Sequence, residues 1–168
     1  MTHRLPDHPD RLAGCRVSDL LRPYAGSAEE LRRRDVLRSA SNPAWDLAEY
    51  LFARAFGWTL AANSARAHDA TDPEGRRDQI KGRRLVTART SRRVSAPRAL
   101  DGVDILAAVL FDARYRVARA ALIPVGIVRD KARYGAHTNS HRFMLQDNIW
   151  KAEGVADVTA VLRAAQDD

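Results

Sequence analysis

Asp69, Gln79 and Lys81 are the residues whose types and spacing best suit chemistry. Asp69 ends one expected strand, the turn at residues 72–75 reverses the chain, and Gln79 and Lys81 lie on the next expected strand. Because side chains alternate along a strand, Gln79 and Lys81 share one face, while the apolar Ile80 points to the core. A carboxylate, an amide oxygen and an ammonium should therefore meet at the rim of a sheet. Such oxygen ligands suit a hard cation such as Mg²⁺, here beside a lysine.

Basic residues surround these positions. The chain carries 25 arginines and three lysines, and its net charge is +7. Ten of the basic residues fall between Arg66 and Arg98, against four acidic ones. A metal ion beside phosphate-binding cations suits phosphodiester hydrolysis, because the metal polarises the phosphoryl group and lowers the pKa of its bound water. Serines and threonines interleave with arginines here, which is typical of phosphate contacts, although a solvated loop has the same composition. The arginines expected to bind nucleic acid are Arg83, Arg84, Arg89, Arg92 and Arg93.

A helix carrying Glu49, followed by Asp69, nine residues and Gln79-Ile80-Lys81 on two hairpin strands, resembles the PD-(D/E)xK nuclease superfamily. The likeness is to its restriction-endonuclease-like and Holliday-junction-resolvase-like branches, and it covers residues 44–123. It implies a mixed sheet of four to five strands flanked by helices. It also implies cleavage of DNA that depends on Mg²⁺ or Mn²⁺, and often a homodimer. By position, Asp69, Glu49 and Gln79 would hold the metal and Lys81 would orient or deprotonate the attacking water.

The sequence departs from that pattern in two places. His68 stands where the name-giving proline would be, and Gln79 replaces the second carboxylate, which removes a negative charge that Glu49 could supply. Asp78 points to the opposite face of the strand unless the register slips, so it cannot simply replace Gln79. Two alternatives stay open. In one, Asp69 caps a turn and Lys81 is an ordinary basic surface residue; in the other, the fold is right and catalysis has been lost.

A short helix and two longer ones are expected before the hairpin. Residues 1–26 contain several prolines and glycines and should form a loosely ordered arm, with a short helix around residues 17–21. Ser27 and Glu30 match a capping box that predicts a helix over residues 28–40. The second of the longer helices starts with Asn42 as N-cap and Pro43, runs over residues 44–56 and stops at Gly57. Its apolar stripe is Trp45, Ala48, Phe52 and Phe56, with Glu49 at the edge.

The rest of the chain alternates strand-like and helix-like segments. Residues 85–102 are rich in Arg, Ser and Thr and should form a mobile loop or a partial helix. His141 and Arg142, on a late strand, could contact the sheet or DNA. We therefore predict an α/β (α+β) domain over residues 27–168 with a central mixed sheet. The expected strands are residues 58–62, 64–69, 77–84, 103–112, 116–123 and 141–145; the expected helices are residues 124–133 and a C-terminal helix with Val155, Val158, Val161, Leu162 and Ala165 on one face.

Composition excludes several classes of protein. No apolar run reaches the ~18 residues of a membrane span, and residues 1–10 lack the apolar core of a secretory signal. The single Cys15 excludes an internal disulfide framework, so the cytoplasm is the expected compartment. Our leading hypothesis is a metal-dependent DNA endonuclease acting in restriction, repair or defence. The alternatives are a catalytically inactive DNA-binding or regulatory module on the same fold, and a basic protein with an acidic protein partner.

Overall fold

The computed structural model describes residues 12–62, 68–96, 100–135 and 140–167. It divides the chain into two compact units, residues 1–37 and residues 38–168. In the parts of the chain so described, no helix is long and apolar enough to cross a membrane.

The first unit contains one continuous helix, α1 (Val17–Arg33), where the sequence predicted a loose arm, a short helix and a new helix start. The short helix predicted around residues 17–21 is present, but it continues through Pro23, so the loose arm predicted for residues 22–26 is wrong. The predicted capping box is also wrong, because Ser27 is inside the helix and Glu30 binds forward to Arg33 and Arg34 at 2.7 Å each. Pairs three and four residues apart support a helix, which helps it continue past the proline.

The second unit is built on a mixed sheet, which confirms the predicted α/β (α+β) class. The strand order is β1 (Thr59–Leu60), β2 (Ala70–Thr71), β3 (Arg77–Arg84), β5 (Ile105–Phe111), β6 (Val117–Pro124) and β9 (Ala156–Asp157). Strands β3 and β5 run parallel, and the other neighbours are antiparallel. The sheet has six strands in the described residues, more than the predicted four to five, because β1, β2 and β9 are pairs of residues at its edges.

A second sheet combines the strand predicted at residues 141–145 with a strand that forms where the sequence predicted a loop. It contains β4 (Arg93–Ala96), β8 (Ser140–Met144) and β7 (Arg133–Gly135), in that order. The predicted loop over residues 85–102 is therefore wrong in part. Strand β4 forms because Val94 pairs with Phe143 of β8 and both side chains are buried. This pairing joins segments far apart in the sequence, so no local pattern announces it.

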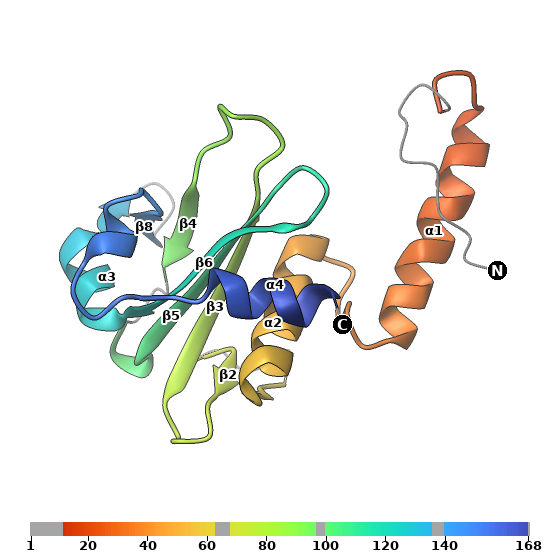
Figure 1. Cartoon of the computed structure of the whole chain (residues 1–168). Helices are drawn as coiled ribbons and strands as arrows, with labels where there is room; N and C mark the ends of the chain where they lie inside the picture. The colour runs from red at the N-terminus through yellow and green to blue at the C-terminus, as the bar shows by residue number, and fades with distance from the viewer. Residues whose placement is uncertain (1–11, 63–67, 97–99, 136–139, 168) are drawn as a thin grey trace. The chain divides into compact units, whose positions relative to one another are not determined.

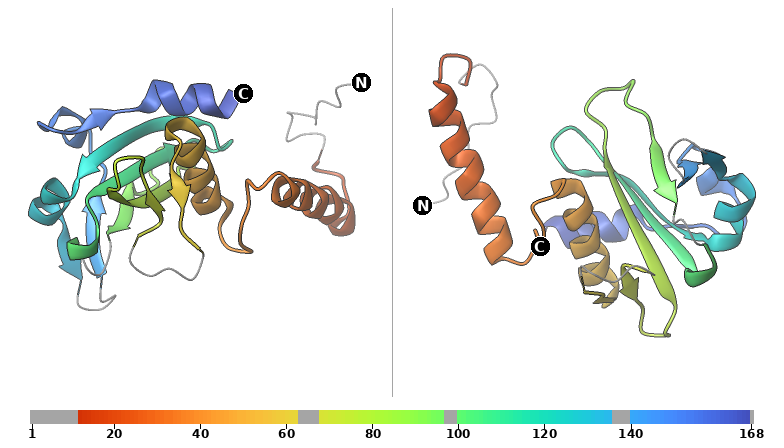
Figure 2. Two further views of the ribbon diagram at one scale, coloured as in Figure 1. Left: turned by 90° about the horizontal axis from the view of Figure 1, so that it is seen from below. Right: turned by 180° about the vertical axis from the view of Figure 1, so that it is seen from behind.

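The main sheet lies between two layers (Figures 1 and 2). Helices α2 (Pro43–Phe56) and α4 (Thr159–Asp167) cover one face, and the second sheet and α3 (Val125–Lys131) cover the other. Strand β5 is buried on both faces, so it has a nearly continuous apolar sequence. Short 3-10 turns at Leu100–Gly102 and Ile149–Lys151 complete the described elements.

Helix α2 follows its sequence signals closely. Asn42 accepts a hydrogen bond from the Ala44 amide at 3.0 Å, and Gly57 ends the helix with φ of 67°. Trp45 corrects the predicted apolar stripe, because it is 56% exposed. The C-terminal helix needs a similar correction. It begins at Thr159, so Val155 precedes it. Val161 is exposed, and Val158 and Leu162 are buried.

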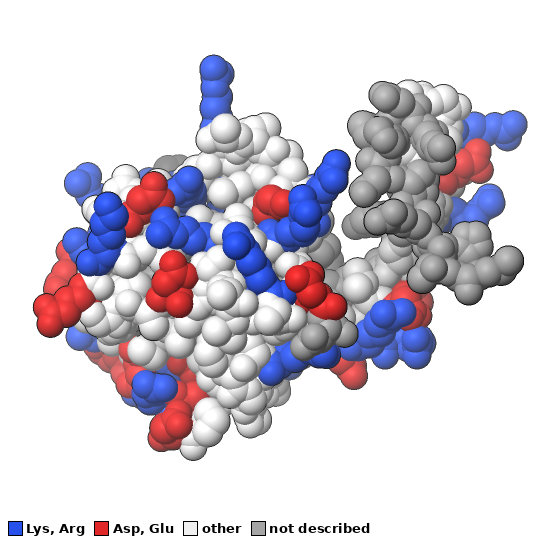
Figure 3. Space-filling model, viewed as in Figure 1, with Lys and Arg blue, Asp and Glu red and all other residues white. Residues whose placement is uncertain are grey.

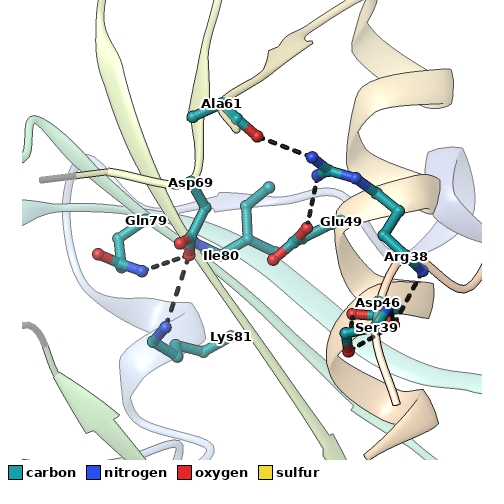
Figure 4. A network of polar contacts seen from close by, with 9 residues as sticks. All are labelled: Arg38, Ser39, Asp46, Glu49, Ala61, Asp69, Gln79, Ile80 and Lys81. Atoms are coloured by element: carbon teal, nitrogen blue, oxygen red, sulfur yellow. Dashed lines mark hydrogen bonds and ion pairs between the residues drawn. The ribbon is translucent and has the colours of Figure 1, made fainter. Parts of the chain in front are cut away.

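Gly82 brings α2 against the centre of β3. A β-carbon at this position would overlap the Ala44 carbonyl and lie 2.8 Å from the Ala48 β-carbon. Ile80, on the same face of β3, is buried under α2, as alternation along the strand predicts. The close approach places Glu49, one residue after Ala48, beside the edge of β3 where Asp69 lies (Figure 4).

Candidate active site

Asp69 caps the edge of β3 just beyond the point where β2 stops pairing with it. The amide of Asp69 donates to the Asp78 carbonyl at 2.9 Å, and among the described residues β2 pairs with β3 no further along this edge. The Asp69 carboxylate binds there instead: its Oδ2 accepts from the Ile80 amide at 2.8 Å and from the Gln79 side-chain amide. The Lys81 ammonium lies 3.5 Å from the same oxygen. The predicted meeting of Asp69, Gln79 and Lys81 is therefore present.

Glu49 approaches the same place from α2 (Figure 4). Its Oε2 accepts from the Arg38 guanidinium at 3.0 Å, and Arg38 also donates to the Ala61 carbonyl at 2.8 Å. Burial raises the pKa of the Glu49 carboxyl, and the charges of Asp69 and then Asp46 add to the rise, while Arg38 and Lys81 oppose it. The effect of Asp69 means that the two carboxylates lie close enough for their negative charges to repel each other. A bound cation would relieve that repulsion.

Asp46 fixes Arg38 beside Glu49. Its carboxylate accepts from the backbone amides of Arg38 at 3.0 Å and Ser39 at 2.8 Å, and from the Ser39 hydroxyl at 2.9 Å. Asp46 is buried and lies one helical turn before Glu49 on α2. Sequence reasoning missed both Arg38 and Asp46. Asp46 lies three residues before Glu49, so the two are neighbours on the surface of the helix. This spacing is a sequence signal that could have linked Asp46 to the site.

Two hollows meet at Glu49 and Asp69. One, of about 230 Å³, also contains Arg38, Trp45 and His68. The other, of about 330 Å³, runs along β3 and β4, and we call it the β3–β4 groove. It is lined by Trp45, Glu49, Asp69, Ile80, Lys81, Gly82, Arg83, Arg93, Val94 and Ser95. The two candidate acids therefore face solvent-accessible space on both sides.

Gln79 is placed differently from its expected role. Its side-chain nitrogen, and not its oxygen, faces the Asp69 carboxylate, and the side chain is buried. The carboxylate accounts for this, because it accepts hydrogen bonds and attracts a donor. Rotation of the amide exchanges its oxygen and nitrogen, so Gln79 could offer an oxygen only by giving up this bond. In the arrangement described, Gln79 supports Asp69.

The residues fit an oxygen-liganded cation held mainly by Asp69 and Glu49. All the contacts to Asp69 above fall on Oδ2, and within the described residues Oδ1 has no hydrogen bond. Mg²⁺ commonly binds one or two carboxylates and keeps several waters, so two acids suffice. The described residues contain no group of three His, Cys, Asp or Glu side chains arranged for a metal, which leaves the pair as the available donor set.

The five predicted nucleic-acid-binding arginines divide into separate groups. Arg83 and Arg93 line the β3–β4 groove with Lys81. Arg84 instead donates to the Ala113 carbonyl at 3.0 Å and lies over the Tyr115 ring. Arg92 pairs with Asp147 at 2.9 Å, and Arg89 is exposed on the loop before β4. The site thus gathers two of the five.

Three aromatic residues and one histidine complete the comparison with the sequence. Trp58 and Phe111 are buried, and Trp150 is buried with its indole nitrogen donating to the Ala120 carbonyl at 3.2 Å. His68, in the position of the name-giving proline, contacts the Thr71 hydroxyl at 3.2 Å. His137 lies outside the described residues.

Comparison with known proteins gives no independent assignment of this site. No protein-family model matches the chain, and no curated protein sequence matches it.

Proposed function

We propose that this protein is a metal-dependent DNA endonuclease of the PD-(D/E)xK type, which hydrolyses phosphodiester bonds. The observation that carries the proposal is the convergence of Lys81 and Asp69, 3.5 Å apart at the edge of β3, with Glu49 reaching the same place from α2. A structural ion pair needs no second carboxylate, no groove and no further cations beside it. All three are found together here.

Asp69 and Glu49 would hold Mg²⁺ or Mn²⁺, with Gln79 keeping Asp69 in place. When bound, the ion polarises the scissile phosphoryl group and lowers the pKa of its water. The Lys81 ammonium lies beside Asp69 and can hold the attacking water and stabilise the negative charge that develops on the phosphate. Arg83 and Arg93, on the walls of the groove, bind the neighbouring phosphates and set the position of the DNA strand.

The test is nicking of supercoiled plasmid by the full chain in Mg²⁺ or Mn²⁺, with EDTA as the metal-free reaction. We expect cleavage by the wild type, none in EDTA, and a loss of about 10²-fold or more in Asp69→Asn, which keeps the shape but removes the charge. Asp101→Asn is the matched control, because the Asp101 side chain is 96% exposed. Cleavage by Asp69→Asn at the wild-type rate would refute the site. So would a wild type that is inactive on duplex, junction and single-stranded DNA.

A catalytically inactive DNA-binding or regulatory module is the second candidate, and one observation favours it. Each carboxylate already faces a basic side chain, Lys81 at Asp69 and Arg38 at Glu49. These pairs balance charge without a metal. Binding of DNA in EDTA by a wild type that never cleaves would favour this candidate over the nuclease.

A further inference from the structure

The outer face of the second sheet carries a row of arginines. Ser95 of β4 pairs with Arg142 of β8, which pairs with Arg133 of β7, so the three share one face. Arg93, two residues before Ser95, lies on that face as well. The alternate residues Val94 and Phe143 point inward and are buried in the core. We call the set of Arg93, Ser95, Arg133 and Arg142 the arginine row.

The arginine row has no acidic counterpart. Strands β4, β7 and β8 contain no Asp or Glu, and no described acidic residue forms an ion pair with Arg93, Arg133 or Arg142. Several arginines elsewhere in this unit are paired with acids, among them Arg116 with Asp112 and Arg119 with Asp147. The face that Figure 3 shows likewise mixes basic and acidic side chains. An uncompensated row is what an anionic partner requires.

Arg142 is held along the surface. A β-carbon at Gly135 of β7 would lie 2.8 Å from Nε of Arg142 and 3.1 Å from its Cζ. Gly135 therefore leaves the space in which the Arg142 guanidinium lies across β7, and Arg142 is half-buried as a result. Holding a guanidinium in place reduces the side-chain entropy that binding would otherwise cost.

The row is continuous with the candidate active site. Arg93 and Ser95 line the same groove as Lys81, Arg83 and Asp69, and β8 and then β7 follow β4 away from that groove. Neighbouring strands lie ~4.8 Å apart, so the row from Ser95 to Arg133 spans about 10 Å. Phosphates of one DNA strand rise by ~3.4 Å each along the duplex axis and lie farther apart than that along the backbone, so the row is long enough to contact more than one of them.

We propose that the arginine row binds the sugar-phosphate backbone of the nucleic acid whose scissile phosphate enters the β3–β4 groove. The inference rests on the proposed function, because that function places the scissile phosphate in the groove and so sets the path of the DNA strand. The row recognises phosphate by charge and by the forked guanidinium geometry, and it reads no base. It extends the interface from Arg83 and Arg93 across the second sheet to Arg142 and Arg133.

The test compares Arg133→Gln/Arg142→Gln with the charge-matched Arg54→Gln/Arg116→Gln, whose arginines contact Tyr50 and Asp112. The measurement is fluorescence anisotropy in EDTA with a labelled single-stranded oligonucleotide, and separately with its duplex, over a series of salt concentrations. We expect the row variant to bind on the order of tenfold more weakly. The slope of log K against log salt should fall by about two, one for each lost phosphate contact. The control pair should match the wild type, and circular dichroism shows that each variant is folded.

Each outcome separates this inference from the proposed function. Equal losses of affinity in the row variant and the control variant would mean that only net charge matters, which would overturn the inference. An unchanged affinity of the row variant would overturn it too. So would a wild type that binds neither the single-stranded nor the duplex probe. A wild type that cleaves while the row variant binds normally refutes the row and leaves the nuclease. A wild type that binds through the row but never cleaves refutes the nuclease and leaves the row. The probe that loses more affinity identifies the form of DNA that lies on the row.

Discussion

Asp69 and Asp78 are neighbours across a strand pair, joined by a backbone hydrogen bond of 2.9 Å, yet their carboxylates meet opposite environments. Asp69 opens onto the β3–β4 groove and has a backbone amide, a side-chain amide and an ammonium at one oxygen. Asp78 is fully buried, and neither of its oxygens has a hydrogen-bond partner among the described residues. The edge of β3 at Asp69 therefore has donors that stabilise a charged carboxylate, whereas the interior at Asp78 has none among the described residues.

The comparison shows that the position of donors, more than residue type, decides what a carboxylate can do. Burial raises the pKa of Asp78 to about 7, and Asp72 adds to the rise more than Arg76 offsets it. Asp78 is therefore a neutral acid over much of the acidic range. It also lies on the face of β3 opposite to Gln79 and Lys81, as alternation predicted, so it cannot supply the carboxylate that Gln79 lacks.

The largest effect that we expect from this contrast concerns stability. Below pH about 4 the Asp78 carboxyl is protonated in both the folded and the unfolded chain. As pH rises to about 7, the unfolded chain has lost this proton while the folded protein keeps it. The free energy of unfolding should therefore fall by about 4 kcal/mol from this residue and change little above that pH. Asp78→Asn should abolish that fall, because an amide does not titrate.

Urea unfolding at intervals from pH 4 to pH 8 measures this difference. The quantity to compare is the change in unfolding free energy with pH, because the amide introduced by Asp78→Asn also costs something for its own unpaired polar atoms. Asp101→Asn, at an exposed position, should keep the wild-type profile. If Asp78→Asn declined with pH as steeply as the wild type, the contrast between buried and supported carboxylates would be lost.

The second effect tests the Asp69 side of the contrast. Lys81→Ala should reduce DNA cleavage by about 10²–10³-fold, because it removes a positioned charge at the reacting phosphate. DNA binding should stay nearly intact, because one ammonium contributes about one counterion to the salt slope. Lys81→Arg should fail as well, since a planar, forked guanidinium does not place its charge where the compact ammonium does. Plasmid nicking and a metal-free gel shift measure the two properties.

Lys131→Ala is the matched control, because Lys131 is an exposed lysine at the end of α3. Wild-type cleavage by Lys81→Ala would assign any activity to another part of the chain. A parallel loss of binding and cleavage would make Lys81 a contact for DNA only.

Local signals predicted the parts of the fold that local forces decide. The Asn42 cap, Pro43 and Gly57 gave the bounds of α2, and the turn at residues 72–75 with alternation gave β3. The same turn and alternation also predicted that Asp69 and Lys81 come together. The sequence misled where one local pattern competed with another: Ser27 and Glu30 match the spacing of a capping box, but the helix already runs through both residues.

Long-range contacts account for the remaining differences. Strand β4 exists because Val94 meets Phe143 in a distant segment, and β7 and β8 join it for the same reason. The Arg38 and Glu49 pair depends on Asp46 holding the chain before α2 against the helix. Such contacts depend on how distant elements pack together in space, and the spacing of residues along the chain does not predict them.

The smallest effect that we expect concerns the pH dependence of the site. Burial and Asp69 raise the pKa of Glu49, and Arg38 lowers it. Arg38→Gln removes that opposing charge, so the pKa of Glu49 should rise further. A carboxyl must lose its proton to bind a metal ion, so binding is lost as pH falls through this pKa. The acidic limb of the cleavage profile, and of Mn²⁺ binding followed by calorimetry, should therefore move to higher pH.

Arg54→Gln is the control. Arg54 lies on α2, the helix of Glu49, and among the described residues its side chain binds the Tyr50 hydroxyl, so this change should leave both profiles in place. The two readouts separate the possible roles of Arg38. A shift in both shows that Arg38 tunes the charge of a metal-binding Glu49. A fall in activity at every pH, with the Mn²⁺ profile unchanged, would instead mean that Arg38 contacts DNA and that Glu49 is not a ligand. A limb that moved to lower pH would contradict the electrostatic argument itself, because losing a cation cannot make a neighbouring carboxyl more acidic unless the site has rearranged.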